Sequence, residues 1–126
     1  MRLRNLPYVT LWAVNFEQEA SLYKEILGLP VTQENANFIM FDTRGSRLAF
    51  HRLKRGRRLD RQTVELHLEV DDVDEIYSAL QRKGVKFDDK PANRPWGNRT
   101  ASFHDAEGYE VEIVGPLRSG EPVKGD

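Results

Sequence analysis

Residues 64–84 read VELHLEVDDVDEIYSALQRKG, and this stretch decides the fold. Its first half alternates apolar and polar residues with a period of two, which predicts a strand that buries one face. Asp72 and Glu75 have the capping-box spacing, and apolar residues then recur at helical spacing up to Gly84, a residue suited to the left-handed position after a helix. The stretch therefore predicts a strand that leads directly into an amphipathic helix.

The same pattern occurs 56 or 57 residues earlier in the chain. Residues 8–14 are rich in β-forming side chains, Asn15 and Gln18 repeat the capping-box spacing, and Gly28 ends an apolar helical stripe of about three turns. The chain thus contains two copies of a strand followed by a helix.

A hairpin is predicted after each helix. Residues 37–51 contain two strands around the turn at 42–45, and residues 100–114 repeat them around the turn at 105–108, at an offset of 63. Asp at the start and Gly at the end of each turn suit a type I turn closed by a left-handed residue. The additional residues of the second copy are expected mostly in a loop over residues 91–97. Two copies of one supersecondary unit indicate a duplication, so we predict an α+β fold of two βαβββ modules.

The length of 126 residues is that of one ordinary domain. Six basic residues occur within residues 52–61 without interleaved aromatic residues, which favours a solvated linker over a nucleic-acid surface. The predicted organisation is module 1 at about 6–54, a basic linker at 55–62, module 2 at about 63–116 and a flexible tail at 117–126.

Composition excludes several functional classes. The net charge of −1 provides no overall field that would attract nucleic acid or an anionic membrane, and the absence of cysteine excludes disulfides, thiolate zinc sites and cysteine nucleophiles. No apolar run approaches the length of a membrane span, and no secretory signal pattern is present, so we expect a cytoplasmic protein. Phosphoryl transfer, hydride transfer and triad hydrolysis are unsupported, because their motifs do not occur.

Four short motifs occur in order between about residues 6 and 116. They are Tyr23 with ILGL at 26–29, EVDDV at 69–73, PWG at 95–97, and Phe103 with Asp105, Gly108 and Glu112. Together they resemble the vicinal oxygen chelate superfamily of glyoxalases, bleomycin-resistance proteins and extradiol dioxygenases, although Ala106 replaces the usual proline of the last motif. The resemblance implies that each module curls a four-stranded sheet, that helices cover the convex faces, and that the concave faces line a cleft for a small organic molecule. It also implies a homodimer.

Strand alternation and the resemblance together assign residues to the predicted cleft. Its candidate ligand-binding residues are Tyr8, Trp12, His51, Glu65, His67, Trp96, Phe103 and Glu112. Trp12 either stacks on a flat or cationic ligand or fills the core, and Tyr8 either donates a hydrogen bond or fills space. Trp96 is expected to be a lid, a pocket wall or part of a subunit interface.

The resemblance places possible metal ligands at Tyr8, Ala49, Glu65 and Glu112. The superfamily uses His, Glu or Gln at these positions, and a catalytic ion needs about three protein ligands, so a metal-free site is the leading interpretation. The alternative is a displaced site made by Glu65, His67 and Glu112, with His51 as a further candidate, for a divalent ion such as Zn, Ni, Mn or Fe.

Two functions therefore remain open. One is metal-independent binding or sequestration of a flat, cationic organic molecule, as in bleomycin-resistance proteins. The other is a metal-dependent lyase, isomerase or transferase of the glyoxalase I type that uses Glu65 and Glu112 as catalytic residues. Without a metal, burial and mutual repulsion would raise the pKa of one of these carboxyls and allow proton transfer; alternatively, both simply accept hydrogen bonds from the ligand. Extradiol chemistry is disfavoured, because the matched positions offer no histidine for its iron site.

Overall fold

The computed structural model describes residues 1–3 and 6–125. They form two compact units, Met1–Asp60 and Arg61–Asp126, and each is described by itself. The boundary between the units falls within the range predicted as a basic linker. None of the helices in these residues is long and apolar enough to cross a membrane.

The first unit contains one mixed sheet with a helical segment. Its elements are β1 (Val9–Ala13), α1 (Phe16–Ser21), the π-helical segment η1 (Leu22–Ile26), β2 (Val31–Glu34), β3 (Phe38–Asp42) and β4 (Arg47–Arg52). The strand order is β1-β4-β3-β2, with β1 parallel to β4 and the other pairs antiparallel.

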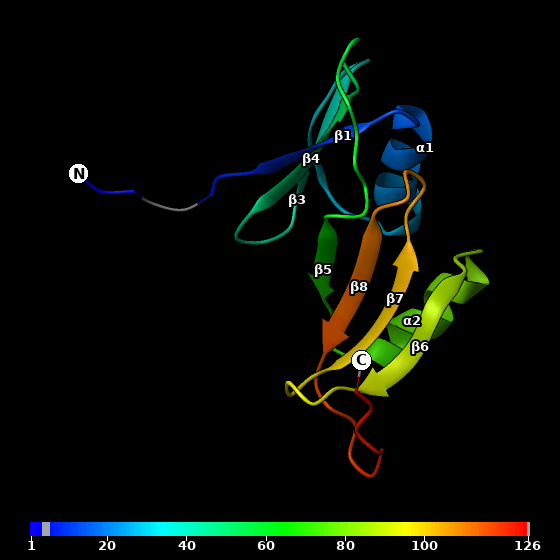
Figure 1. Ribbon diagram of the computed structural model, residues 1–126. Coiled ribbons are helices and arrows are strands. Elements are labelled where there is room, and N and C mark those ends of the chain that lie inside the picture. The colour runs from blue at the N-terminus through cyan, green and yellow to red at the C-terminus, as the bar shows by residue number, and fades with distance from the viewer. Residues whose placement is uncertain (4–5, 126) are drawn as a thin grey trace. The chain divides into compact units, whose positions relative to one another are not determined.

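The second unit repeats this arrangement (Figure 1). Its elements are β5 (Glu65–Glu69), α2 (Val73–Arg82), β6 (Phe87–Asn93), β7 (Arg99–His104) and β8 (Glu110–Gly115). The strand order is β5-β8-β7-β6, again with the first strand parallel to the last. The predicted pair of βαβββ modules is therefore confirmed.

Helix α2 covers one face of the second sheet. Val73 of the helix, Ala101 of β7 and Ile113 of β8 are almost completely buried together, with Ile76 and Tyr77 of the helix packed against them. Ala101 lies opposite Ile113 in the ladder, and such cross-strand neighbours share a face. The polar residues that alternate with these apolar ones along the strands therefore lie on the other face of the sheet.

The first sheet is arranged in the same way. Tyr23 of η1 packs against Phe41 and Phe50, with ring centroids 5.9 and 4.7 Å apart. Phe50 and its alternate neighbour Leu48 therefore face the helical segment, whereas Ala49 and His51 lie on the opposite face.

The two predicted helix caps differ in the structure. The Asp72 carboxylate accepts a hydrogen bond from the Glu75 backbone N–H at 3.1 Å, so this cap is confirmed. Asn15 makes no side-chain cap bond, because its φ of −95° and ψ of 58° depart from the extended backbone of a capping residue. The first helix is also less regular than predicted, since Leu27 N donates to Leu22 O in a five-residue π turn.

The hairpin offset of 63 holds only for the second strand of each pair. Asp42 pairs with Arg47, whereas His104 pairs with Glu110 across a turn that is one residue longer. The first strands are consequently offset by 62. The predicted loop over residues 91–97 is also shorter, because Pro91–Asn93 belongs to β6, an edge strand in which proline is tolerated.

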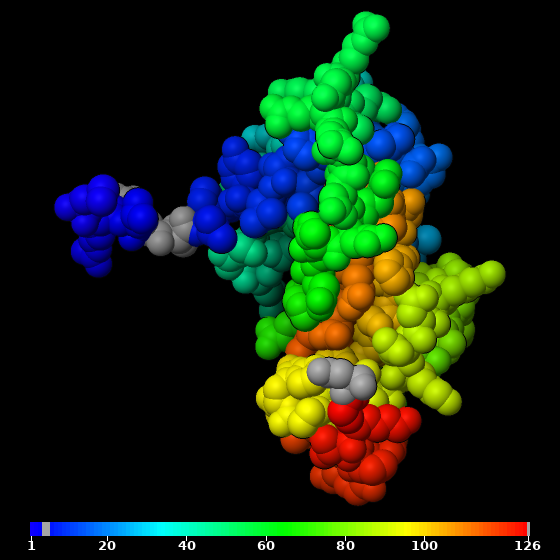
Figure 2. All heavy atoms as spheres, in the orientation of Figure 1, coloured from blue at the N-terminus to red at the C-terminus, as the bar shows by residue number. Residues whose placement is uncertain are grey.

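The C-terminal segment, expected to be a flexible tail, is hydrogen-bonded to the second unit. The Asn93 side-chain amide donates to the backbone carbonyls of Arg118 and Glu121, at 2.8 and 3.3 Å, and Arg94 donates to Gly125 O at 2.7 Å. In Figure 2 this red segment lies against the yellow residues at the end of β6.

Candidate functional site

The second sheet presents a strongly polar surface on the side opposite α2. In the parallel β5–β8 ladder, Glu65 lies opposite Glu110 and His67 lies opposite Glu112. The intervening Leu66 and Leu68 pair with the buried residues of β8, so the polar side chains project from the uncovered side. This surface is called the acidic face below; it comprises Glu65, His67, Glu69, Asp88, Asp89, Ser102, His104, Glu110 and Glu112.

Three carboxylates gather on the acidic face. One oxygen each of Glu65, Glu110 and Glu112 lies within 4.8 Å of the others. His67 Nδ1 is 3.1 Å from Glu112 Oε1, and His67 Nε2 is 3.7 Å from Glu65 Oε1. One imidazole thus contacts two of the three carboxylates, and the cluster keeps an excess of negative charge.

The carboxylates differ in exposure. The side chain of Glu112 is 16% exposed and that of Glu65 is 58% exposed. Burial raises the pKa of Glu112, and the charges of Glu65 and Glu110 raise it further, while His67 opposes both effects. The expectation that burial and repulsion raise the pKa of one carboxyl is confirmed for Glu112, which is thereby more easily protonated than an ordinary glutamate.

Two further carboxylates extend the acidic face toward β6. Ser102 lies opposite Glu112 and donates to Asp89 Oδ2 at 3.0 Å. The exposed His104 is 2.6 Å from Asp88 Oδ2 through Nδ1. Both histidines of the second unit therefore lie on this face, each against a carboxylate.

Glu110 was missed by the sequence analysis. The resemblance assigns one ligand position to the strand that follows the last turn, and Glu112 fills it. A signal was nevertheless present, because Glu110 is two residues before Glu112 and so shares its face. Only the parallel register shows that Glu110 also lies directly opposite Glu65.

The first sheet carries a different surface on the side away from its helical segment. Trp12 and His51 lie opposite each other in the β1–β4 ladder, with ring centroids 5.0 Å apart. Phe38 packs on the other side of His51, at 6.1 Å. Two cations of the chain itself, Lys54 and Arg57, stand over the Trp12 ring at 5.5 and 5.2 Å.

The structure corrects the placement of Phe103. This side chain is fully buried and packs against Phe87, which in turn packs against Tyr77 of α2, with ring centroids 5.2 and 4.6 Å apart. Phe103 therefore lies on the helix-covered side of the sheet, between two residues of the acidic face. The resemblance had placed Phe103 among the cleft residues, but strand alternation alone separates it from its neighbours Ser102 and His104.

The metal-ligand positions of the first module do not fit an ion. Ala49 is fully buried and offers only a methyl group, and Tyr8 precedes β1 with 49% of its surface exposed. Trp96 is 54% exposed in the loop between β6 and β7, and its predicted role as a lid or interface residue stays a prediction.

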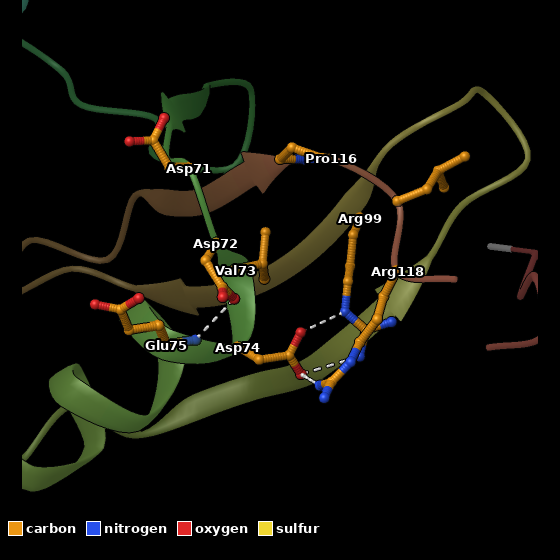
Figure 3. A pocket seen from close by; sticks show the side chains of 9 residues that line it. Asp71, Asp72, Val73, Asp74, Glu75, Arg99, Pro116 and Arg118 are labelled. Atoms are coloured by element: carbon orange, nitrogen blue, oxygen red, sulfur yellow. Dashed lines mark hydrogen bonds and ion pairs between the residues drawn. The ribbon is translucent and has the colours of Figure 1, made fainter. Parts of the chain in front are cut away.

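A separate pocket of about 460 Å³ lies at the N-terminal end of α2 (Figure 3). Arg99 donates to Asp74 from Nε and Nη2 at 2.7 and 3.0 Å, and Arg118 contacts the same carboxylate at 3.2 Å. The hydrogen bond from Arg99 lowers the pKa of Asp74. Because these charges already compensate one another, we assign the pocket a structural role in fixing the C-terminal segment to α2.

The architecture is that of the glyoxalase, bleomycin-resistance and dioxygenase superfamily, also called the vicinal oxygen chelate superfamily. The chain is similar to a glyoxalase/bleomycin resistance protein/dioxygenase from Nocardioides, with a TM-score of 0.76 and 22% identity over 98% of this chain and 91% of that one. It is similar to a lactoylglutathione lyase from Agrobacterium tumefaciens, with a TM-score of 0.75 and 15% identity over 96% of this chain and 100% of that one. At these identities the likeness shows the fold.

Sequence comparison places the chain within this superfamily more closely. The glyoxalase-like domain family matches residues 6–118, and the chain belongs to this family. The uncharacterized protein YraH of Bacillus subtilis is 27% identical over 122 residues, which cover 86% of this chain and 95% of YraH.

Proposed function

We propose that the protein binds a small organic molecule through a positively charged group held on the acidic face. The observation that carries this proposal is the cluster of Glu65, Glu110 and Glu112, two of which contact the single histidine His67. Like charges directly opposite each other destabilise a sheet, so a cluster of this kind opposes folding. A ligand that brings a positive charge removes that repulsion, and the trade of stability for binding is common at functional sites.

The half-buried Glu112 is the main anchor in this proposal. A planar amidinium or guanidinium group donates two parallel hydrogen bonds to a carboxylate, which gives both strength and orientation. Glu65 is more exposed and adds attraction at the rim of the site. Because a bound cation favours the ionised carboxylate, binding releases any proton held by Glu112 and weakens as the pH falls below its raised pKa.

Benzamidine and benzamide test this proposal as a charged and a neutral probe of the same shape. With a Kd of about 1 mM, 10 mM benzamidine would stabilise the folded protein by about 1.4 kcal/mol, which is measurable as a thermal shift. We expect no comparable shift with benzamide, and loss of the benzamidine shift in Glu112→Gln.

Glu69→Gln provides the matched control. Glu69 lies on β5 and on the same face, but it does not belong to the three-carboxylate cluster. Equal stabilisation by benzamide, or equal loss of binding in Glu69→Gln and Glu112→Gln, would contradict the proposal.

A metal-dependent lyase, isomerase or transferase of the glyoxalase type is the second candidate. It is favoured by the approach of three carboxylate oxygens to within 4.8 Å, since oxygen donors suit hard divalent ions such as Mn²⁺. Glu65, Glu110 and Glu112 would hold the ion, with Glu110 taking the place of the ligands that Tyr8 and Ala49 do not supply. A bound ion would supply Lewis-acid polarisation of a substrate oxygen.

Metal analysis separates the two candidates. The protein is purified without chelator or affinity tag, its metal content is measured, and Mn²⁺ is then added while thermal stability is followed. A stoichiometric ion that is lost in both Glu110→Gln and Glu112→Ala would favour the metal-dependent candidate over sequestration. Enclosure of the ligand by both modules, a homodimer and a cytoplasmic location stay predictions of the resemblance and composition.

A further inference from the structure

We propose that residues 118–125 of the second unit form a releasable strap that holds the loop carrying Trp96 in its closed form. The strap is hydrogen-bonded to Asn93 and Arg94, at the base of the Trp96 loop, residues 94–98 (Figure 2). Docking of the strap and closure of the loop are then one conformational change with two states. This inference does not depend on the function proposed for the acidic face.

Asn93 is the centre of the contact with the strap. It ends β6 and is 3% exposed. Its side chain pairs with both main-chain groups of Arg118, since Nδ2 donates to Arg118 O at 2.8 Å and Oδ1 accepts from Arg118 N at 3.0 Å. Nδ2 also donates to Glu121 O at 3.3 Å, and the Asn93 carbonyl accepts from Lys124 N at 2.8 Å. The Asn93 side chain therefore bonds mainly to the strap, and Arg99 Nη1 donates to it from β7.

Arg94 connects the strap to the Trp96 loop. Its Nη1 donates to Gly125 O at 2.7 Å, and its Nε donates to Thr100 Oγ1 on β7 at 3.1 Å. The backbone of the same residue closes the loop, because Arg94 N donates to Asn98 O at 2.7 Å. One arginine thus joins the strap, β7 and the base of the loop that encloses Trp96.

The strap is held mainly by hydrogen bonds, so it can leave without unfolding the second sheet. All of residues 118–125 are exposed, and Val123, which forms an isolated parallel bridge with Asn93, is 59% exposed. The core of the unit is built instead by Val73, Ala101 and Ile113, on α2, β7 and β8. A segment with few buried apolar contacts opens at a much lower free energy than such a core.

Release of the strap changes the support of an exposed aromatic side chain. Trp96 is 54% exposed, and a large amphipathic ring at the surface is suited to contact a ligand or another protein. When the strap leaves, Asn93 and Arg94 lose their bonds to it, and the loop loses its support on that side. Binding that uses the closed position of Trp96 would therefore favour the docked strap, and release of the strap would weaken that binding.

The indole N–H signal of Trp96 reports this coupling by NMR, because the chain has only two tryptophans and Trp12→Phe assigns the remaining signal. Lys124→Pro removes the backbone N–H that donates to Asn93 O and changes no residue of β6, β7 or the loop. We expect the Trp96 signal to move and the amide exchange of Arg94 to rise at least about tenfold. Lys124→Ala is the matched control, since it loses the same side chain but keeps the N–H, and it should change this exchange less than about twofold.

Asn93→Asp tests the same coupling from β6. The carboxylate has nearly the same shape, but it cannot donate to the carbonyls of Arg118 and Glu121. We expect the Trp96 signal to move in the same direction as in Lys124→Pro. Arg118→Gln removes the side-chain contact with Asp74 but keeps the main-chain bonds to Asn93, so it should leave the Trp96 signal close to that of the wild type.

Three results would overturn the inference. Faster amide exchange within the strap, with the Trp96 signal and the exchange of Arg94 unchanged, would show that the strap does not support the loop. Equal effects of Lys124→Pro and Lys124→Ala would show that the lysine side chain acts, and not the backbone bond. Unchanged amide exchange of the strap in both Lys124→Pro and Asn93→Asp would show that these hydrogen bonds do not hold it.

Discussion

Replacement of Glu110 by Gln should stabilise the protein, although it removes a charged side chain from a polar surface. The nearest oxygens of Glu110, Glu65 and Glu112 are within 4.8 Å of one another. Two unit charges at that distance repel by about 0.9 kcal/mol in water and by about 3.5 kcal/mol at an effective dielectric constant of 20. Because Glu65 is 58% exposed, the lower value applies more closely, and we expect a gain of about 1 kcal/mol.

Urea unfolding followed by far-ultraviolet circular dichroism measures this gain. With a slope of about 2 kcal/mol per molar urea, the midpoint of Glu110→Gln should rise by about 0.5 M at low ionic strength. In 1 M NaCl the screening length falls to about 3 Å, so most of the gain should disappear. Glu69→Gln is the control and should change little. An unchanged or lower midpoint for Glu110→Gln at low salt would refute the view that repulsion among the three carboxylates destabilises the folded protein.

Three further outcomes follow from the packing and charges of the second unit. Phe103→Ala should lower the free energy of unfolding by about 3–5 kcal/mol, because the ring is fully buried, and a conservative Phe103→Leu should retain benzamidine binding by calorimetry. Asp74→Ala should cost about 2–3 kcal/mol near neutral pH by leaving the guanidinium of Arg99, 6% exposed, without its carboxylate. Since the pKa of Asp74 is lowered by folding, the difference from wild type in urea unfolding should shrink as the pH falls below about 4. Folding raises the pKa of Glu112, so Glu112→Gln should be the more stable protein at neutral pH and should lose this advantage on acidification; an advantage that grows in acid would contradict the assignment.

Much of the fold could be predicted because it depends on short-range patterns. Alternation in β5 separates Leu66 and Leu68 from Glu65 and His67, and the structure places these pairs on opposite faces of the sheet. The cap at Asp72 is also local, since donor and acceptor are three residues apart. The start of the first helix was harder to predict. Asn15 and Gln18 are the residue types of a capping box, but the backbone of Asn15 does not have the extended conformation that a capping residue needs.

The site was only partly predictable, because its features depend on register and on a turn. Glu110 meets Glu65 through pairing between strands that are far apart in the chain. The basic segment has no aromatic residue of its own, yet its turn brings Arg57 to Trp12, more than forty residues earlier. The ion pair of Asp74 with Arg99 likewise joins a helix to a distant strand. The spacing of residues along the sequence does not predict such contacts between distant parts of the chain.

The central claim is that the acidic face of the second unit binds a cationic group, and a titration of isotope-labelled protein with benzamidine tests it most directly. Amide and side-chain signals of β5 and β8 should shift saturably, with the largest changes at Glu65, His67, Glu110 and Glu112, and benzamide should not reproduce them. Shifts confined to the pocket around Asp74 and Arg99, or no saturable shift at millimolar benzamidine, would contradict the claim.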